Sequence, residues 1–280
     1  MYLGHFGLTE LPFSITPDTQ FVYSAASHQE ALNTLLLAVR GGEGFVKITG
    51  EVGTGKTLLC RRFLATLGDD CVAAYVPNPQ VDATALLQEV AEELGTDSGA
   101  DDAVHIVKRI NRRLLTLAEQ GKTAVLCIDE AQTMPIPTLE TLRLISNLET
   151  EKRKLIQIVL FGQPELDEKL EQPSVRQLRQ RIVFHFRMPG LKRSELGAYV
   201  EHRLRVAGYH GGRLFSGPAR RALFRHSGGM PRLVNILAHK AMLAAFGEGG
   251  DQVRLRHVRA AARDTEGARK GGWPMFWSLA

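Results

Sequence analysis

The stretch GEVGTGKTLLC, residues 50–60, joins an apolar run to an apolar helical pattern through a glycine-rich turn. Gly50, Gly55, Lys56 and Thr57 fit the spacing GxxxxGK(S/T), in which backbone N–H groups close around phosphate oxygens. The helix that follows adds a favourable dipole at its N-terminus. Because the motif lies between a predicted strand and a predicted helix, it predicts a P-loop rather than a turn without a ligand.

We expect the whole loop to line the nucleotide site. Its residues are Gly50, Glu51, Val52, Gly53, Thr54, Gly55, Lys56, Thr57 and Leu58. Lys56 is expected to reach the β- and γ-phosphates, and the Thr57 hydroxyl to ligate Mg²⁺. The predicted cofactors are therefore ATP and Mg²⁺.

Short apolar runs with β-branched residues predict buried strands, because polar residues, glycine or proline bound each of them. The runs are 44–50, 71–77, 123–129, 155–161 and 181–188. Helical spacing fills the intervals, at 56–67, 82–94, 101–119 and 137–149. This alternation predicts an α/β domain over residues 41–190, with a parallel sheet covered on both faces.

After Pro189 the strand pattern stops, and glycine-rich breaks separate segments with helical spacing. These segments are 193–207, 217–226, 231–246 and 255–264. The sequence thus predicts a three-layer α/β domain followed by a small helical domain over 191–265.

The segment AVLCIDEA, residues 124–131, ends a predicted strand in two carboxylates. The strand delivers Asp129 to the carboxyl edge of the sheet, where ligands bind in such folds, so Asp129 is expected to hold Mg²⁺. The neighbouring Glu130 is suited to orienting or activating an attacking water. A kinase does not need that residue, so the pair predicts an NTP hydrolase.

Three other polar positions are weaker candidates. Gln163, at the end of the fourth strand, can contact the γ-phosphate or the attacking water, or it is an ordinary loop residue. In RQLRQRI, residues 176–182, an arginine can reach the nucleotide of an adjacent subunit, although surface arginines are common. Arg232, next to the helix-starting Pro231, can point back at the γ-phosphate from the small domain.

The charge is distributed unevenly along the 280 residues. Residues 1–175 carry 15 Lys and Arg against 24 Asp and Glu, and residues 176–280 carry 20 against 6. The C-terminal part therefore favours an anionic partner, unless its charge forms only a solvated face. The three cysteines show no metal-ligand spacing, and we expect buried free thiols in a reducing cytoplasm. No secretion signal or membrane-spanning run is found.

These elements together resemble the AAA+ ATPases: a P-loop, a DE box, a polar sensor on the fourth strand, an arginine before the fifth strand and an arginine in a helical lid. The N-terminal block MYLGHFGLTELPFSITPDTQFVYSAASHQEAL and the segments GEGFVKITGEVGTGKTLLCR and FGQPEL look like the ExeA/MshM family of secretion and pilus-biogenesis ATPases. The resemblance covers roughly residues 1–265.

The resemblance implies roles for individual residues. Gln163 matches the sensor, Arg232 the lid sensor and Arg181 the arginine finger, with Arg179 as the second choice for the finger. Residues 1–40, around Phe13, Pro17 and His28-Gln29-Glu30, look like the segment that packs on the adenine; an ordinary hydrophobic staple is the alternative.

The family also implies a setting for the protein. ExeA-type members carry a transmembrane segment and a peptidoglycan-binding domain after the ATPase, and this sequence ends before either. It is therefore expected to be closer to the stand-alone MshM type: cytoplasmic, homo-oligomeric, and in contact with an inner-membrane or envelope protein. Two Trp and a Phe in the tail GGWPMFWSLA, within residues 266–280, can dock on a partner or membrane, or fold back on the lid.

Three functions follow from the sequence. The first is an ATP-hydrolysing assembly factor for a type IV (MSHA-like) pilus or type II secretion machinery. The second, favoured by the basic C-terminal part, is a DNA-dependent AAA+ ATPase of the kind that assists transposition. The third is a nucleotide-gated scaffold with negligible turnover, which the presence of Glu130 disfavours.

Overall fold

The computed structural model describes residues 2–15, 19–21, 23, 25–96, 102–149 and 154–269. Pro17 and the aromatic tail lie outside the described residues. The chain divides into two compact units, an α/β unit and a helical unit. The α/β unit comprises Ala26–Glu51 and Gly55–Pro189; the helical unit comprises Met1–Ala25, Val52–Thr54 and Gly190–Ala280.

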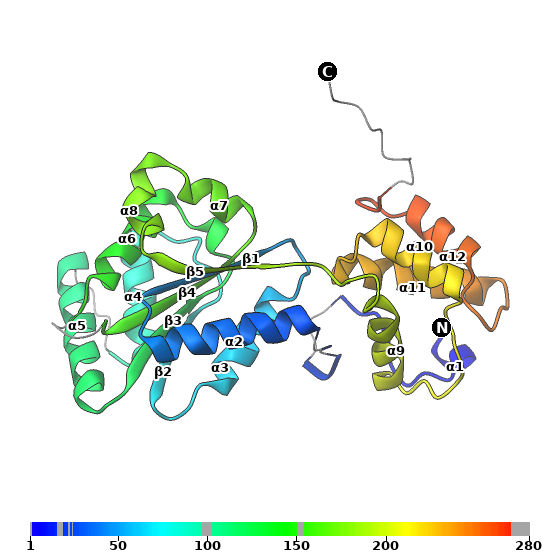
Figure 1. Cartoon of the computed structure of the whole chain (residues 1–280), viewed down its shortest axis with the longest axis horizontal. Coiled ribbons are helices and arrows are strands. Elements are labelled where there is room, and N and C mark those ends of the chain that lie inside the picture. The colour runs from blue at the N-terminus through cyan, green and yellow to red at the C-terminus, as the bar shows by residue number, and fades with distance from the viewer. Residues whose placement is uncertain are drawn as a thin grey trace, which may run out of the picture. The chain divides into compact units, whose positions relative to one another are not determined.

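The α/β unit is built on a parallel sheet with the strand order β2-β3-β4-β1-β5 (Figure 1). Its strands are β1 (Phe45–Gly50), β2 (Cys71–Val76), β3 (Thr123–Ile128), β4 (Ile156–Gly162) and β5 (Ile182–Met188). The central strands β1, β3 and β4 are almost wholly buried, which explains their continuous apolar runs. All strands that the sequence predicts are confirmed.

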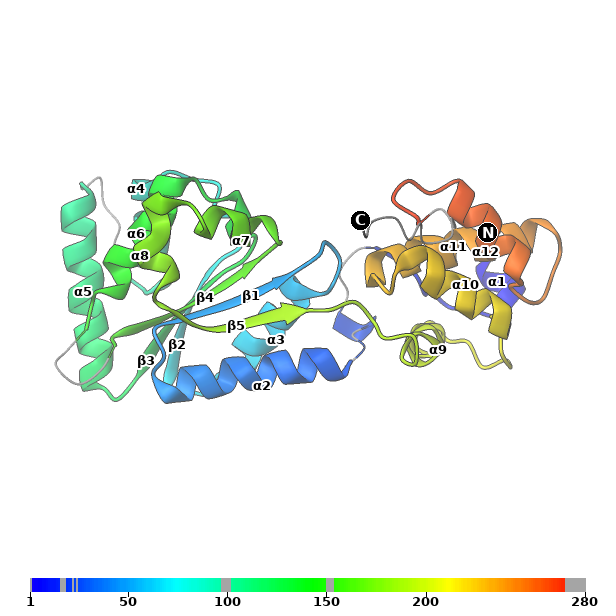
Figure 2. The same ribbon diagram turned by 45° about the horizontal axis from the view of Figure 1, so that its top comes forward.

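Helices cover both faces of this sheet, as Figure 2 shows. One core joins Leu126 and Ile128 of β3 to the apolar sides of α4, α5 and α6. The other joins Val125 and Cys127 of the same strand to α2 and α3. Successive residues of a strand point to opposite faces, so one strand supplies both cores. The five helices are α2 (Ala26–Gly41), α3 (Lys56–Thr66), α4 (Ala83–Glu93), α5 (Ala103–Glu119) and α6 (Ile136–Ser146).

Side-chain caps set where two of these helices begin. The carboxylate of Asp82 accepts a hydrogen bond from the backbone N–H of Ala85, at 2.9 Å, and that of Asp102 accepts one from His105, also at 2.9 Å. Each bond satisfies a backbone donor that has no partner within the helix. The predicted start of a helix at Asp82 is thereby explained.

Short elements connect the later strands of the α/β unit. They are η2 (Ala131–Thr133), α7 (Glu165–Leu170), η3 (Pro173–Val175) and α8 (Arg176–Arg179). The first begins three residues after the end of β3, and α7 begins three residues after the end of β4. Both therefore stand at the carboxyl edge of the sheet, where they fix the residues that follow the strands.

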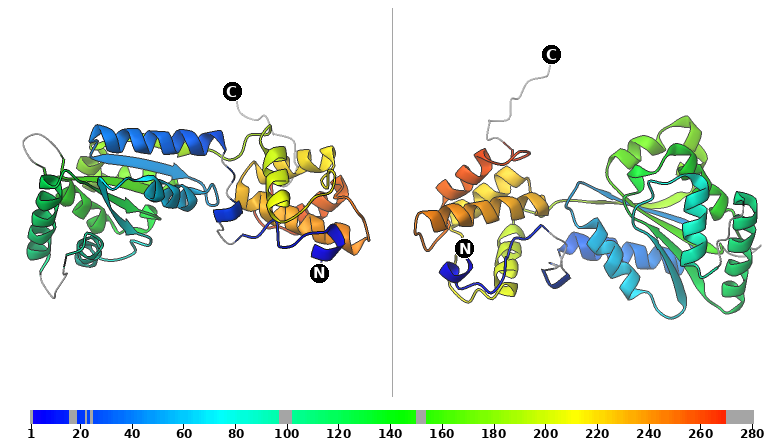
Figure 3. Two further views of the ribbon diagram at one scale, coloured as in Figure 1. Left: turned by 90° about the horizontal axis from the view of Figure 1, so that it is seen from below. Right: turned by 180° about the vertical axis from the view of Figure 1, so that it is seen from behind.

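The helical unit contains α1 (Leu3–Phe6), η1 (Thr19–Phe21), α9 (Leu196–Val206), α10 (Gly217–Ser227), α11 (Pro231–Gly247) and α12 (Leu255–Arg263) (Figure 3). Its core is rich in alanine and leucine from α10, α11 and α12. Among the described residues, no helix of either unit is both long and apolar enough to cross a bilayer.

The N-terminal segment packs within the helical unit. The Phe13 ring is buried and meets Phe215 edge-on, with the ring centroids 5.8 Å apart. The Arg203 guanidinium is also buried and donates to the backbone oxygens of Pro12 and Ser14, at 2.5 and 3.3 Å. Met1–Ala25 group with the helical unit, and Ala26–Gly41 form α2 of the α/β unit.

Candidate nucleotide-binding and hydrolysis site

The P-loop connects the end of β1 at Gly50 to the start of α3 at Lys56. Gly53 and Gly55 have φ angles of +79° and +93°, a backbone conformation that L side chains rarely adopt. Gly55 is restricted by space as well: a Cβ there would lie 2.7 Å from Nε2 of His28 in α2. The loop therefore needs glycine at both positions, and His28 of the N-terminal motif lies against it.

Lys56 is held inside the loop that it follows. Its side chain is buried, and Nζ donates to the backbone oxygens of Gly50 and Glu51, at 2.7 and 3.1 Å. Burial lowers the pKa of Lys56, while the nearby carboxylates of Glu130 and Asp129 oppose that shift. An ammonium in this position is suited to exchanging carbonyl partners for the more strongly bonding phosphate oxygens.

Asp129 comes directly after β3 and is only 2% exposed. Its carboxylate accepts hydrogen bonds from the Thr57 hydroxyl and from the backbone N–H of Glu130, the latter at 2.9 Å. Burial raises the pKa of Asp129, although both hydrogen bonds act in the opposite direction. The two predicted Mg²⁺ ligands, Thr57 and Asp129, are therefore in contact. Such an oxygen pair fits Mg²⁺, which usually takes few protein ligands beside water and phosphate oxygens.

Glu130 has an unusual backbone. Among the described residues, it is the one non-glycine residue with a positive φ, at +50°. Its carboxylate Oε2 accepts hydrogen bonds from Nε2 of Gln132, at 2.6 Å, and from Nε2 of Gln163, at 3.2 Å. Strained backbone of this kind is concentrated at functional sites, where the surrounding contacts maintain it.

Two glutamines thus fix the Glu130 carboxylate. The backbone N–H of Gln163 also donates to Oε1 of Gln132, at 2.9 Å, so the three side chains form one connected network. The structure brings Gln163 to Glu130, across the ends of β3 and β4. Sequence reasoning missed Gln132, although a signal was present: an amide side chain two residues after Glu130, in the same turn at the carboxyl edge of the sheet.

The arginines before β5 lie away from this site. They precede a strand that runs parallel to β1, so they stand at the opposite edge of the sheet. The Arg181 guanidinium donates to the Ser146 hydroxyl, at 2.7 Å. The Arg179 side chain is exposed, and it forms no hydrogen bond or ion pair with another described residue. Of the two, Arg179 is therefore free to contact a second molecule.

Arg232 lies in the helical unit, where it is the second residue of α11. Pro231 occupies the first turn of that helix, as its sequence position predicts. The role of Arg232 toward a nucleotide stays a prediction.

The three cysteines carry free thiols. Cys60 of α3 and Cys127 of β3 are buried, as expected from their apolar neighbours, and Cys71 is half-buried. A hydrogen bond with Cys127, together with burial, raises the pKa of the Cys60 thiol. The pair therefore acts as core packing between α3 and the sheet.

Comparison with known proteins agrees with this geometry. Residues 39–170 match the family model described as AAA domain. Over 275 residues the chain is 40% identical to general secretion pathway protein A of Aeromonas hydrophila. The matched region covers 98% of this chain and 50% of that relative. The chain thus spans about half the length of the curated relative it matches. Both similarities agree with the expected resemblance to the ExeA family.

Solved structures share the architecture at low sequence identity. The chain is similar to the ORC2 protein of Aeropyrum pernix, with a TM-score of 0.62, 19% identity, and coverage of 90% of this chain and 71% of that one. Cdc6p of Pyrobaculum aerophilum gives a TM-score of 0.64 at 18% identity, covering 89% and 71%. The RuvB motor of Thermotoga maritima gives a TM-score of 0.53 at 17% identity, and the match covers 84% of this chain and 69% of that one. The fold is that of a P-loop AAA protein.

Proposed function

We propose that this protein is a Mg²⁺-dependent ATPase that drives the assembly of a secretion or pilus apparatus. The observation that carries the hydrolytic part is the Glu130 network, because a nucleotide-binding switch needs no carboxylate fixed beside the Mg²⁺ ligand. The assembly part rests on the 40% identity to general secretion pathway protein A.

Each residue of the site has a role in this proposal. Lys56 binds the phosphates and offsets the charge that develops as the terminal P–O bond breaks. Asp129 and Thr57 hold Mg²⁺, which when bound neutralises charge on the phosphate oxygens. Glu130 orients the attacking water and accepts its proton, and Gln132 and Gln163 keep its carboxylate in place.

The setting we propose is that of a homo-oligomer acting at a type II secretion system or an MSHA-like type IV pilus, through an inner-membrane protein. An arginine before β5, either Arg181 or Arg179, completes the site of the neighbouring subunit, and Arg232 senses the γ-phosphate. ATP binding orders the subunit interface and hydrolysis releases it, so that the cycle is transmitted to the partner.

A second candidate is a DNA-dependent ATPase, for which the observation is the basic C-terminal part, with 20 Lys and Arg against 6 Asp and Glu. Arginines of α10 and α12 contribute to this charge. Phosphate contacts by such residues make binding strongly dependent on salt.

Steady-state phosphate release, measured against protein concentration with and without duplex DNA, separates these functions. A rate that rises with concentration and ignores DNA supports the assembly ATPase. Stimulation by DNA at low salt, lost at high salt, supports the second candidate. Tight ATP binding with no release at any concentration, in the presence of Mg²⁺, contradicts both and leaves a nucleotide-gated scaffold.

A further inference from the structure

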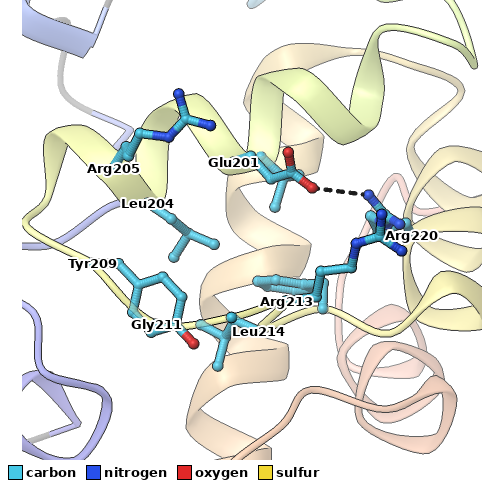
Figure 4. Close-up of a pocket in the computed structure, with 11 residues that line it drawn as sticks. Glu201, Leu204, Arg205, Tyr209, Gly211, Arg213, Leu214 and Arg220 are labelled. Carbon is cyan, nitrogen blue, oxygen red and sulfur yellow. Dashed lines mark hydrogen bonds and ion pairs between the residues drawn. The ribbon is translucent and has the colours of Figure 1, made fainter.

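The helical unit contains a pocket of about 280 Å³, separate from the P-loop (Figure 4). It is lined by the C-terminal half of α9, by the loop from Tyr209 to Phe215, and by Arg220 in the first turns of α10. None of these residues takes part in the proposed nucleotide chemistry. A role for the pocket must therefore be inferred from its own shape and charge.

The inner part of the pocket is apolar. Val200, Leu204, Leu214 and Phe215 line it, and all four belong to the buried core of the helical unit. The Tyr209 ring packs closely against Gly211, where an added Cβ would lie 2.6 Å from ring atoms. Because core residues form this surface, the pocket is a fixed feature of the fold and can bury an apolar side chain.

The outer part of the pocket is cationic. Arg220 pairs with Glu201 of α9, with 3.1 Å between Nη1 and Oε1. Arg205 and Arg213 are exposed, and their guanidinium groups form no hydrogen bond or ion pair with another described residue. In Figure 4, the Arg213 side chain lies on the same side of the pocket as the Glu201–Arg220 pair. The residues that line the pocket thus include three arginines and one carboxylate, Glu201, which pairs with Arg220 and leaves Arg205 and Arg213 available to an anionic ligand.

Size limits what this pocket can accept. Sites for drug-sized ligands and cofactors usually enclose about 300–1,000 Å³, and this pocket lies just below that range. It accommodates one or two apolar side chains more readily than a whole nucleotide. The arginines at the rim favour carboxylates, which guanidinium groups bind with paired hydrogen bonds.

We propose that this pocket docks an acidic peptide segment of a partner protein. An aromatic or aliphatic side chain of the segment enters between Leu204, Tyr209 and Leu214, and flanking carboxylates pair with Arg205 and Arg213. Recognition of acidic motifs by arginine clusters, with a buried apolar anchor at the centre, is an established way of binding peptides. This inference is independent of the proposed ATPase, because the pocket shares no residue with the nucleotide site.

The test is a titration of the full chain against a fluorescein-labelled hexapeptide, in which Leu-Phe stands between two carboxylate residues on each side. Fluorescence anisotropy reports the affinity at 150 mM salt, where the Debye length is about 8 Å. The double variant Arg205→Glu with Arg213→Glu is expected to bind at least about tenfold more weakly, because both cationic partners of the peptide are reversed.

The matched control is Arg221→Glu with Arg225→Glu, which makes the same change in net charge. Both arginines are exposed on α10 and neither lines the pocket. Its affinity should stay within about twofold of the wild type, because screening limits the effect of distant charges. Both double variants should retain the basal ATPase rate and the melting temperature.

A third variant, Tyr209→Ala, keeps every charge but removes one apolar wall. The Tyr209→Ala variant should bind the peptide about tenfold more weakly than the wild type. The wild type should in turn bind a peptide with Ser-Ser in place of Leu-Phe about tenfold more weakly than the original peptide. The proposal would be overturned if both double arginine variants lost the same amount of peptide affinity, or if replacing Leu-Phe with Ser-Ser left the affinity unchanged. Either result would mean that the basic surface attracts any anion. The absence of saturable binding tighter than about 1 mM would overturn the proposal as well.

Discussion

At the scale of single residues, the site is notable for how its carboxylates are held. Asp129 contacts Thr57, and Glu130 accepts two amide hydrogen bonds on a backbone with positive φ. These neighbouring residues at one strand end therefore have different surroundings, which suit the proposed roles of Asp129 in cation binding and of Glu130 in orienting water. This separation makes predictions for individual side chains.

Replacing Glu130 with Gln should remove hydrolysis and keep ATP binding. The amide preserves the size of the side chain but cannot accept a proton from water, so kcat should fall by about 10²–10⁴-fold. Phosphate release measures the rate, and equilibrium binding of a fluorescent ATP analogue measures affinity. A Glu130→Gln variant that turns over at the wild-type rate would show that another group activates the water.

Replacing Gln132 with Ala should lower kcat about tenfold and leave the KM for ATP unchanged, since the lost hydrogen bond to Glu130 is worth on the order of 1.5 kcal/mol. Because Gln132 acts through Glu130, Gln132→Ala should cause no further fall in kcat when Glu130 is already replaced with Gln. The exposed Gln177→Ala is the matched control. Additive losses in the double variant would contradict a positioning role.

The thiols give a second test at this scale. The hydrogen bond with Cys127 and burial raise the pKa of Cys60, so its reactive thiolate should be absent at pH 8. Burial and the nearby Asp70 also raise the pKa of the half-buried Cys71. A thiol reagent should therefore label at most one cysteine in the native protein and all three in guanidinium chloride. Rapid native labelling of Cys60 would disprove its burial.

At the scale of helices and strands, parallel pairing assembles the site. The strands β1, β3 and β4 run parallel, so the residues that follow them meet at one edge of the sheet. Motifs that are far apart in sequence become neighbours in this way: the P-loop, the Asp129–Glu130 pair and Gln163. Stability of the helices beside these strands then depends on local features such as caps.

Asp82 provides such a test, because its side chain caps α4. The substitution Asp82→Ala should destabilise the protein by about 1 kcal/mol, whereas Asp82→Asn keeps an acceptor at the same place and should change little. Thermal unfolding followed by circular dichroism should show a melting temperature about 2–4 °C lower for Asp82→Ala and little change for Asp82→Asn. Equal decreases for both variants would mean that the negative charge, and not the cap, is responsible.

At the scale of the whole molecule, the arginines before β5 are the residues through which we propose that a neighbouring subunit completes the site. They stand at the edge of the sheet opposite the P-loop, so any role in catalysis requires a second subunit. Arg181 is bonded to Ser146, and Arg179 is exposed. Both arginines stay candidates for the finger, and we propose Arg179 ahead of Arg181 for contact with a neighbour because its side chain has no described partner.

The expected outcome is an ATPase rate per subunit that rises with protein concentration and falls about 10³-fold in Arg179→Ala. Arg181→Ala should instead lower the melting temperature, because it removes the hydrogen bond to Ser146. Arg112→Ala, an exposed arginine of α5, is the control and should do neither. A rate that does not depend on concentration in the wild type would rule out the shared site.

Sequence alone determined the strands, most of the helices and the residues of the P-loop and the DE pair. The reason is physical: buried strands need continuous apolar runs, and a phosphate loop needs glycine and Lys at fixed spacing. Only the tertiary structure revealed Gln132 on Glu130, His28 against Gly55, and the cationic pocket of the helical unit. Those arrangements depend on side-chain contacts between separate elements, and the local sequence patterns that predict helices and strands do not specify such contacts.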